Sequence, residues 1–199
     1  MSKKIIRLGA DPFAPYQYID ENGEVKGSDF DIVSEMFKEI GYEVTCEIGD
    51  WGPIYEKFLN KEIDAVFQVQ KTAARQKEFA LSSCFRVGVS EVVTASPDLK
   101  IENYGEFVER NIILGVSENY NYGNEIDTFP DSIKHVYVTM EDLLWAVAKG
   151  EVETAVIDKG VREYIVEKAG MPKLYSLPAL DFERDFYVMY HRDAEFVLR

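Results

Sequence analysis

The chain has 199 residues, 46% of them hydrophobic and 13% aromatic, which is enough for one large or two small globular lobes and unlike a disordered or fibrous protein. Its net charge of -14, from 36 acidic and 22 basic side chains, argues against nucleic acid or an anionic membrane as a partner. No apolar run approaches the roughly 20 residues of a membrane span, and no signal-peptide core precedes the first strand pattern. We therefore expect either a cytoplasmic protein or an exported domain without its leader.

Strand and helix patterns alternate through the first half of the chain. They predict a strand at 5–8, a tight hairpin at Asn22-Gly23, a helix capped by Ser28 or Asp29, a strand at 42–48 and a helix that opens at 50–53. The stretch Glu62–Ser82 then predicts a buried strand, a polar turn and a helix that begins near Thr72. This order is typical of a parallel sheet with crossover helices.

The second half repeats the pattern. It predicts strands at 112–116, 136–138 and 152–157, a short helix at 124–129 and a helix capped by Thr139. The segment Glu151–Val156 matches Glu62–Phe67 as helix end, acidic turn and buried strand. The chain is therefore expected to form two similar lobes.

Two strand-like runs without a helix signal, 87–94 and 185–190, are suited to cross between these lobes. We expect an α/β fold of two similar lobes with mixed, mainly parallel sheets, joined by a two-strand hinge. The predicted bounds are 1–90 plus 185–199 for lobe 1, which is discontinuous, 91–184 for the inserted lobe 2, and 88–93 and 182–187 for the hinge. Such an arrangement leaves a cleft.

In open α/β sheets, ligands bind beyond the carboxyl ends of the strands. The residues expected there combine a cation, anions, amides and aromatic rings: Asp11, Phe13, Trp51, Gln68, Gln70, Arg75, Glu118, Asn119, Tyr120, Asn121 and Asp158. A zwitterion needs this combination. Arg75 and the N–H groups of a helix start suit a carboxylate, Asp158 suits an ammonium group, and an aromatic ring covers the apolar stem.

Six of these residues also have an ordinary structural explanation. The explanations are a surface pair with Glu78 or solvent for Arg75, a helix cap for Asp158, core packing for Phe13 and Trp51, and bonds to turn backbone for Gln68 and Gln70. The functional interpretation rests on the convergence of the residues.

The cysteines and histidines indicate no further chemistry. Cys46 and Cys84 allow one disulfide at most and are expected to be free, buried thiols. His135 and His191 lack the spacing for zinc or for a nucleophilic triad and are expected to be surface or packing residues. We expect no metal and no cofactor.

The chain resembles the type II periplasmic solute-binding proteins, specifically the polar amino-acid receptors of ABC transporters (bacterial extracellular solute-binding proteins, family 3). The resemblance spans nearly the whole chain and is carried by the aromatic-proline opening Asp11–Asp20, the helix start Gly27–Ile32, the strand and Thr-x-x-Arg helix start in Ile63–Ala65 and Thr72–Arg75, and the second-lobe segments Gly115–Gly123 and Gly150–Asp158.

This resemblance implies that Arg75 grips an α-carboxylate, that Asp158 holds the α-ammonium, and that Phe13 stacks on the ligand while hinge closure traps it. It implies a monomeric binding protein, not an enzyme, in the periplasm or outside the cell. Its partners would be an amino acid and the membrane permease of an ABC transporter, with no nucleic acid.

Three departures from the family pattern stand out. Gln68 and Gln70 replace residues that are usually small, which favours a tighter pocket or amide partners for the ligand side chain. The turn Asn119-Tyr120-Asn121 replaces the common Gly-Thr-Thr type. The chain ends at Arg199, where family members usually continue through C-terminal helices that pack on the first lobe.

Two alternatives remain open on the same fold. One is the ligand-sensing domain of a membrane signalling receptor. The other is a cyclohexadienyl or prephenate-type dehydratase, which would need a general acid in the cleft, and Glu118 is the candidate that the sequence places there.

Overall fold

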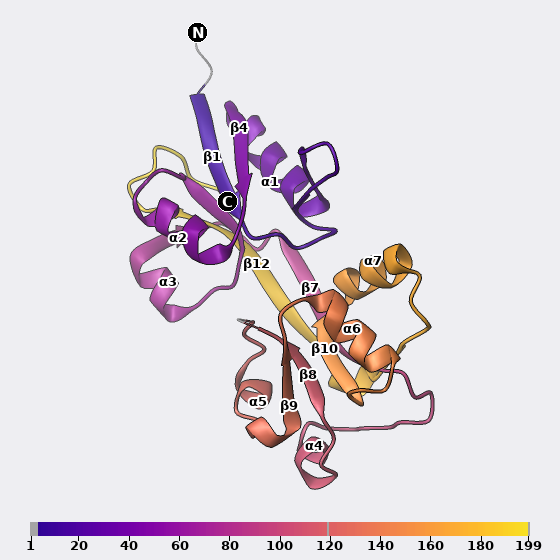
Figure 1. Ribbon diagram of the computed structural model, residues 1–199. Helices are drawn as coiled ribbons and strands as arrows, with labels where there is room; N and C mark the ends of the chain where they lie inside the picture. The colour runs from indigo at the N-terminus through magenta and orange to yellow at the C-terminus, as the bar shows by residue number, and fades with distance from the viewer. Residues whose placement is uncertain (1–3, 119, 199) are drawn as a thin grey trace. The chain divides into compact units, whose positions relative to one another are not determined.

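The computed structural model describes residues 4–118 and 120–198. The chain divides into two compact units: unit 1 contains Met1–Gly88 and Arg184–Arg199, and unit 2 contains Val89–Glu183 (Figure 1). Two strands, β7 (Arg86–Thr94) and β12 (Phe182–His191), each run through a boundary between the units.

Unit 1 is built on three parallel strands followed by one antiparallel strand. In order across the sheet these are β4 (Tyr42–Ile48), β1 (Lys4–Ala10), β5 (Ala65–Val69) and β12, and β6 (Phe79–Leu81) also pairs with β12. Its helices are α1 (Ser28–Glu39), α2 (Trp51–Leu59) and α3 (Ala73–Glu78). The expected hairpin forms between β2 (Tyr18–Ile19) and β3 (Val25–Lys26).

Unit 2 repeats this topology. The parallel strands β9 (Lys134–Tyr137), β8 (Leu114–Ser117) and β10 (Thr154–Asp158) are followed by antiparallel β7, which also pairs with β11 (Tyr175–Ser176). The helices are α4 (Gly105–Glu109), α5 (Asn124–Asp127), α6 (Met140–Ala148) and α7 (Lys159–Ala169), with short turns η1 (Asp131–Ile133) and η2 (Pro178–Leu180). Two units of mixed, mainly parallel sheet confirm the expected fold class.

Each unit has its own apolar core. Strand β5 is buried along Ala65, Val66 and Phe67, as expected for a central strand covered on both faces, and its run of apolar residues predicted this position. In unit 2 the corresponding positions Ala155 and Val156 of β10 are also fully buried. Strands β5 and β10 are therefore equivalent, and each ends at the same edge of its own unit's sheet.

The expected cap of α1 is wrong. The N-cap residue is Gly27, whose φ of 125° favours glycine and whose added Cβ would lie 2.2 Å from the carbonyl oxygen of Tyr16. Asp29 instead lies inside the first turn, fully buried, with Arg86 Nε 2.8 Å from its Oδ1. A tertiary ion pair has overridden the local capping preference.

The helix predicted from Thr72 does form, but it is short. Thr72 caps α3 by accepting a hydrogen bond from the backbone N–H of Arg75 at 3.2 Å, as expected. The helix ends at Glu78, because Phe79 turns inward and begins β6, where it pairs with His191 of β12. His191 is thus a packing residue, as predicted, and its ring also stacks on Phe58 at 4.5 Å.

Both cysteines are free, as predicted, but Cys84 is exposed and Cys46 is only partly buried. Burial raises the pKa of the Cys46 thiol to about 12, so almost none of it is thiolate at pH 8. A thiol reagent should label Cys84 rapidly in the folded protein and Cys46 only after denaturation, and Cys84→Ser should abolish the rapid phase. Rapid labelling of the folded Cys84→Ser protein would contradict this.

Candidate functional site

The carboxyl ends of β1, β4 and β5 lie at one edge of the unit 1 sheet. Ala10 pairs with Ile48 and Gly9 with Val66, so the three strands end close together. Asp11 follows β1 directly, Trp51 begins α2 just after β4, and Gln70 follows β5. Unit 1 therefore brings the sequence-predicted residues to the edge where an α/β sheet binds ligands.

Arg75 is held at this edge by neutral groups. Its Nη1 donates to the backbone oxygen of Gln70 at 2.8 Å, and its Cζ lies 5.7 Å from the ring centre of Trp51. No ion pair joins it to Glu78 in the part of the chain that the structure describes. Partial burial lowers the pKa of the guanidinium, which nevertheless stays charged. Since α3 has only six residues, the guanidinium, rather than a helix N-terminus, is the group at this edge that is suited to an anion.

Gln68 ties β5 to the segment that follows β1. It has a positive φ of 59°, and its side-chain oxygen accepts a hydrogen bond from Nε2 of Gln17. Gln17 is fully buried and also donates to the backbone oxygen of Asp11 at 3.1 Å. Sequence reasoning missed Gln17 because it lies among the polar residues of a hairpin arm. Gln68 thus has a bracing role in unit 1.

Gln70 connects two arginines. Its backbone oxygen accepts from Arg75, and with its amide oxygen turned toward Arg184, that oxygen lies 2.5 Å from both Nε and Nη2 of the guanidinium. Arg184 was not predicted as a site residue because it lies 114 positions further along the chain than Gln70 (184 - 70). The glutamine therefore contacts both arginines.

Phe13 and Asp11 complete the unit 1 edge. Phe13 is only 5% exposed, and its ring stacks on Tyr16 with 5.7 Å between centres, so core packing accounts for much of its surface. Asp11 is half-buried, and burial raises the pKa of its carboxyl group. Of the aromatic residues predicted for this edge, Trp51 is the more accessible.

The unit 2 edge lies at the ends of β8 and β10. These strands are parallel with Ala155 opposite Gly115, and the same register continued brings Asp158 level with Glu118. Glu118 is exposed, and Asn121 accepts a hydrogen bond from the backbone N–H of Gly123 at 3.1 Å. The ring of Tyr120 packs 5.0 Å from that of Tyr122, whereas Asn119 lies outside the described residues.

Asp158 is the N-cap of α7, which is the structural explanation that the sequence offered for it. Its Oδ1 accepts from the backbone N–H groups of Gly160 at 2.9 Å and Val161 at 3.2 Å, and the residue is 3% exposed. The helix cap is therefore one role of this carboxylate, and its role in ligand binding stays a prediction.

Two buried serines of unit 2 were also missed. Ser90 of β7 lies directly opposite Asp158, and Ser117 ends β8. Among the described residues the hydroxyl oxygen of each has no hydrogen-bond partner, which is uncommon for a buried polar group. A serine inside an otherwise apolar strand run was the available sequence signal.

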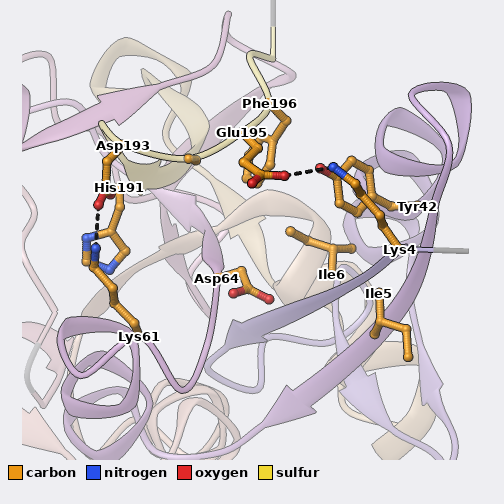
Figure 2. A pocket seen from close by; sticks show the side chains of 11 residues that line it. Lys4, Ile5, Ile6, Tyr42, Lys61, Asp64, His191, Asp193, Glu195 and Phe196 are labelled. Atoms are coloured by element: carbon orange, nitrogen blue, oxygen red, sulfur yellow. Dashed lines mark hydrogen bonds and ion pairs between the residues drawn. The ribbon is translucent and has the colours of Figure 1, made fainter.

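A pocket of about 500 Å³ in unit 1 is a different feature (Figure 2). It is lined by residues near the amino ends of β1 and β4, by Lys61 and Asp64, and by His191 and 193–196. Two ion pairs lie among these residues, Lys4–Glu195 at 2.7 Å and Lys61–Asp193 at 2.5 Å. Because it lies at the opposite end of the strands from Asp11 and Gln70, it is not the candidate site.

Two α/β units of equal topology, connected by two strands and with polar residues at their carboxyl edges, define the type II periplasmic binding protein fold. Residues 6–168 match the bacterial extracellular solute-binding proteins, family 3, and the chain belongs to this family.

Among curated relatives, the histidine-binding periplasmic protein of Salmonella typhimurium is 25% identical over 189 residues, which cover 92% of this chain and 72% of that protein. A probable amino-acid ABC transporter-binding protein of Haemophilus influenzae is 20% identical over 54% of this chain, and the match spans 42% of that protein.

Solved structures show the same fold. A histidine kinase sensor domain with similarity to periplasmic binding proteins has a TM-score of 0.77 at 14% identity, covering 96% of this chain and 83% of that one. The arginine-bound truncated ArgBP from T. maritima has a TM-score of 0.73 at 18% identity, covering 95% and 89%.

Across residues 4–118 and 120–198, no helix has the length and apolar character needed to cross a membrane. In the same residues, no cluster of three or more His, Cys, Asp or Glu side chains is placed to hold a metal ion.

Proposed function

We propose that this chain captures an amino acid, or a similar small zwitterion, and delivers it to the permease of an ABC transporter. The observation that carries the proposal is the equivalent placement of opposite charges. Arg75 follows β5 in unit 1, and Asp158 ends β10 in unit 2. Family membership and relatives named for histidine binding and amino-acid transport support it.

In this proposal, Arg75 holds the α-carboxylate through charge-assisted hydrogen bonds, each worth about 1.5–3 kcal/mol. Asp158 accepts from the α-ammonium, and the hydroxyl of Ser90 is suited to bond the same end of the ligand. Trp51 covers part of the apolar stem. The two units act as lobes that close on the ligand about hinges near 88–93 and 182–187. The protein works as a monomer in the periplasm or outside the cell.

We propose further that the chain is not an enzyme. A dehydratase needs a general acid whose protonation state is set by its surroundings, usually through burial. Glu118, the residue that the sequence offered for this role, is exposed at the end of β8. Binding and release of a ligand without a chemical step require only charged groups such as Arg75 in unit 1 and Asp158 in unit 2.

A sensing role is the second candidate, because a histidine kinase sensor domain shares the fold over 96% of this chain. In that case, ligand capture would be the same but the partner would be a signalling module rather than a permease. The gene sequence that flanks the part encoding this chain distinguishes transport from sensing. A membrane span followed by a kinase domain would favour sensing.

A thermal-shift screen tests the ligand class. An amino acid present at about 1,000 times its Kd should add about 4 kcal/mol to the stability of the folded protein and raise its Tm by several degrees. Sugars, which lack a zwitterionic head, should leave the Tm unchanged. If no amino acid raises the Tm at millimolar concentration, the proposed function is wrong.

A further inference from the structure

Another pocket of unit 1 lies beside α3 and β6. It has a volume of about 320 Å³, and it is lined by Lys71, Gln76, 79–82, Tyr187 and Arg192. All of these residues belong to unit 1. None of them was predicted for the amino-acid site, so this pocket is a separate feature.

The charged side chains that line this pocket are both positive. They are those of Lys71 and Arg192, and no Asp or Glu is found among the described residues of the lining. The chain as a whole has 36 acidic and only 22 basic side chains, so a pocket with cations alone runs against its overall charge. A pocket lined by one sign of charge attracts ligands of the opposite sign. This pocket therefore favours an anion.

Both cations are held by neutral groups. Nη2 of Arg192 donates a hydrogen bond to the backbone oxygen of Gln76, and Nζ of Lys71 lies 5.9 Å from the ring centre of Tyr187. A carbonyl oxygen and a phenol ring carry no net charge, so these contacts orient the two cations and leave their charge in place. Within the part of the chain that the structure describes, neither cation forms an ion pair with a carboxylate.

The acidic residues close to this pocket do not line it. Asp193, directly after the arginine, pairs instead with Lys61 at 2.5 Å. Asp185 accepts a hydrogen bond from the hydroxyl of Tyr187 at 3.2 Å, and Glu78 is exposed at the end of α3. The positive charge of the lining is therefore available to a ligand.

The two cations approach the same short helix. Lys71 directly precedes Thr72, the N-cap of α3, and the guanidinium of Arg192 contacts Gln76 in that helix. Since an α-helix rises about 1.5 Å per residue, Thr72 and Gln76 lie about 6 Å apart along its axis. One small ligand can therefore contact both cations. A tetrahedral anion suits them, because its oxygens point in several directions and can accept from a lysine and an arginine that approach from different sides.

We propose that this pocket binds a small tetrahedral dianion, phosphate or a phosphomonoester, between Lys71 and Arg192. The side-chain amide of Gln76, which lines the same pocket, is suited to donate a further hydrogen bond. The site is distinct from the amino-acid site at Arg75, so the protein can hold both ligands at once.

Titration calorimetry with sodium phosphate tests the inference, at about pH 8, where a phosphate group is mainly dianionic, and at an ionic strength held constant with sodium chloride. Two charge-assisted contacts predict a Kd of about 1 mM or below. Lys71→Gln and Arg192→Gln should each weaken binding about 10-fold, whereas Arg192→Lys, which keeps the charge, should retain part of the affinity. A parallel titration with glycerol 3-phosphate distinguishes an ester from free phosphate, since the natural ligand class should bind more tightly.

Lys77→Gln is the matched control. It removes the same charge from an exposed position of α3 outside the pocket lining and should leave phosphate affinity within about twofold. An equal loss in Lys77→Gln would overturn the inference, because net charge alone would then explain binding. Binding that is lost in Arg75→Ala but kept in Lys71→Gln and Arg192→Gln would also overturn it, because the anion would then lie at the amino-acid site. Absence of binding by both phosphate compounds at about 10 mM would overturn it outright.

Discussion

Replacing Arg75 with alanine is expected to weaken amino-acid binding by at least about 100-fold, because two charge-assisted hydrogen bonds to a carboxylate contribute about 3–6 kcal/mol together. Folding should change little. Among the described residues, the Arg75 side chain makes one hydrogen bond, to the backbone oxygen of Gln70, and a bond of this kind contributes about 1 kcal/mol to stability. Calorimetry for binding and urea denaturation for stability separate the two effects.

Two further variants sharpen this test. Arg75→Lys keeps the positive charge but loses the planar fork, so its affinity should fall between those of the unaltered protein and Arg75→Ala. Lys77→Ala removes a charge from an exposed position of the same helix and should leave affinity unchanged. Arg75→Ala protein that binds its amino acid within threefold of the unaltered protein would exclude Arg75 as the carboxylate ligand.

The largest stability effect is expected at the ion pair between Arg86 and Asp29. Asp29 is fully buried, and Arg86 Nε lies 2.8 Å from its Oδ1 and 2.9 Å from its Oδ2. The guanidinium lies between two rings, 3.7 Å from the centre of Tyr16 and 4.2 Å from that of Phe186. Arg86→Ala should lower the free energy of unfolding by about 3–5 kcal/mol, because it leaves a buried carboxylate without its guanidinium.

The exposed pair of Lys4 and Glu195 provides the control for this effect. Both side chains are more than half exposed, at 63% and 78%, and such pairs contribute at most about 1 kcal/mol. Lys4→Ala should therefore leave the urea midpoint nearly unchanged. The double variant Asp29→Ala, Arg86→Ala should cost less than the sum of its two single variants, since each single variant already removes the interaction between the two charges. Equal midpoints for Arg86→Ala and Lys4→Ala would refute this assignment.

Local sequence patterns were sufficient for most of the scaffold. The apolar run of β5, the Thr72 cap and the matching segment before Asp158 are contiguous features, and each predicts an element that the structure contains. The same features placed Arg75 and Asp158 at the carboxyl ends of equivalent strands, because strand polarity follows from chain direction.

Contacts between distant residues could not be predicted in this way. Asp29 precedes an apolar periodic run, which is the pattern of a helix cap, and only the fold reveals that Arg86, 57 positions away, draws it into an ion pair. The two glutamines before Arg75 are a second example. Their partners are Gln17 and Arg184, which no local pattern connects to them.

The central claim is that Arg75 binds the α-carboxylate and Asp158 the α-ammonium of one amino acid, and titration calorimetry of the unaltered protein with each standard amino acid tests it most directly. We predict that at least one amino acid binds with one-to-one stoichiometry and a Kd of about 1 μM or below, which corresponds to about -8 kcal/mol. The same amino acid without its α-carboxylate or without its α-ammonium should bind at least about 100-fold more weakly. Absence of binding by every amino acid, or equal affinity for a ligand that lacks one of the two charged groups, would contradict these two roles of Arg75 and Asp158.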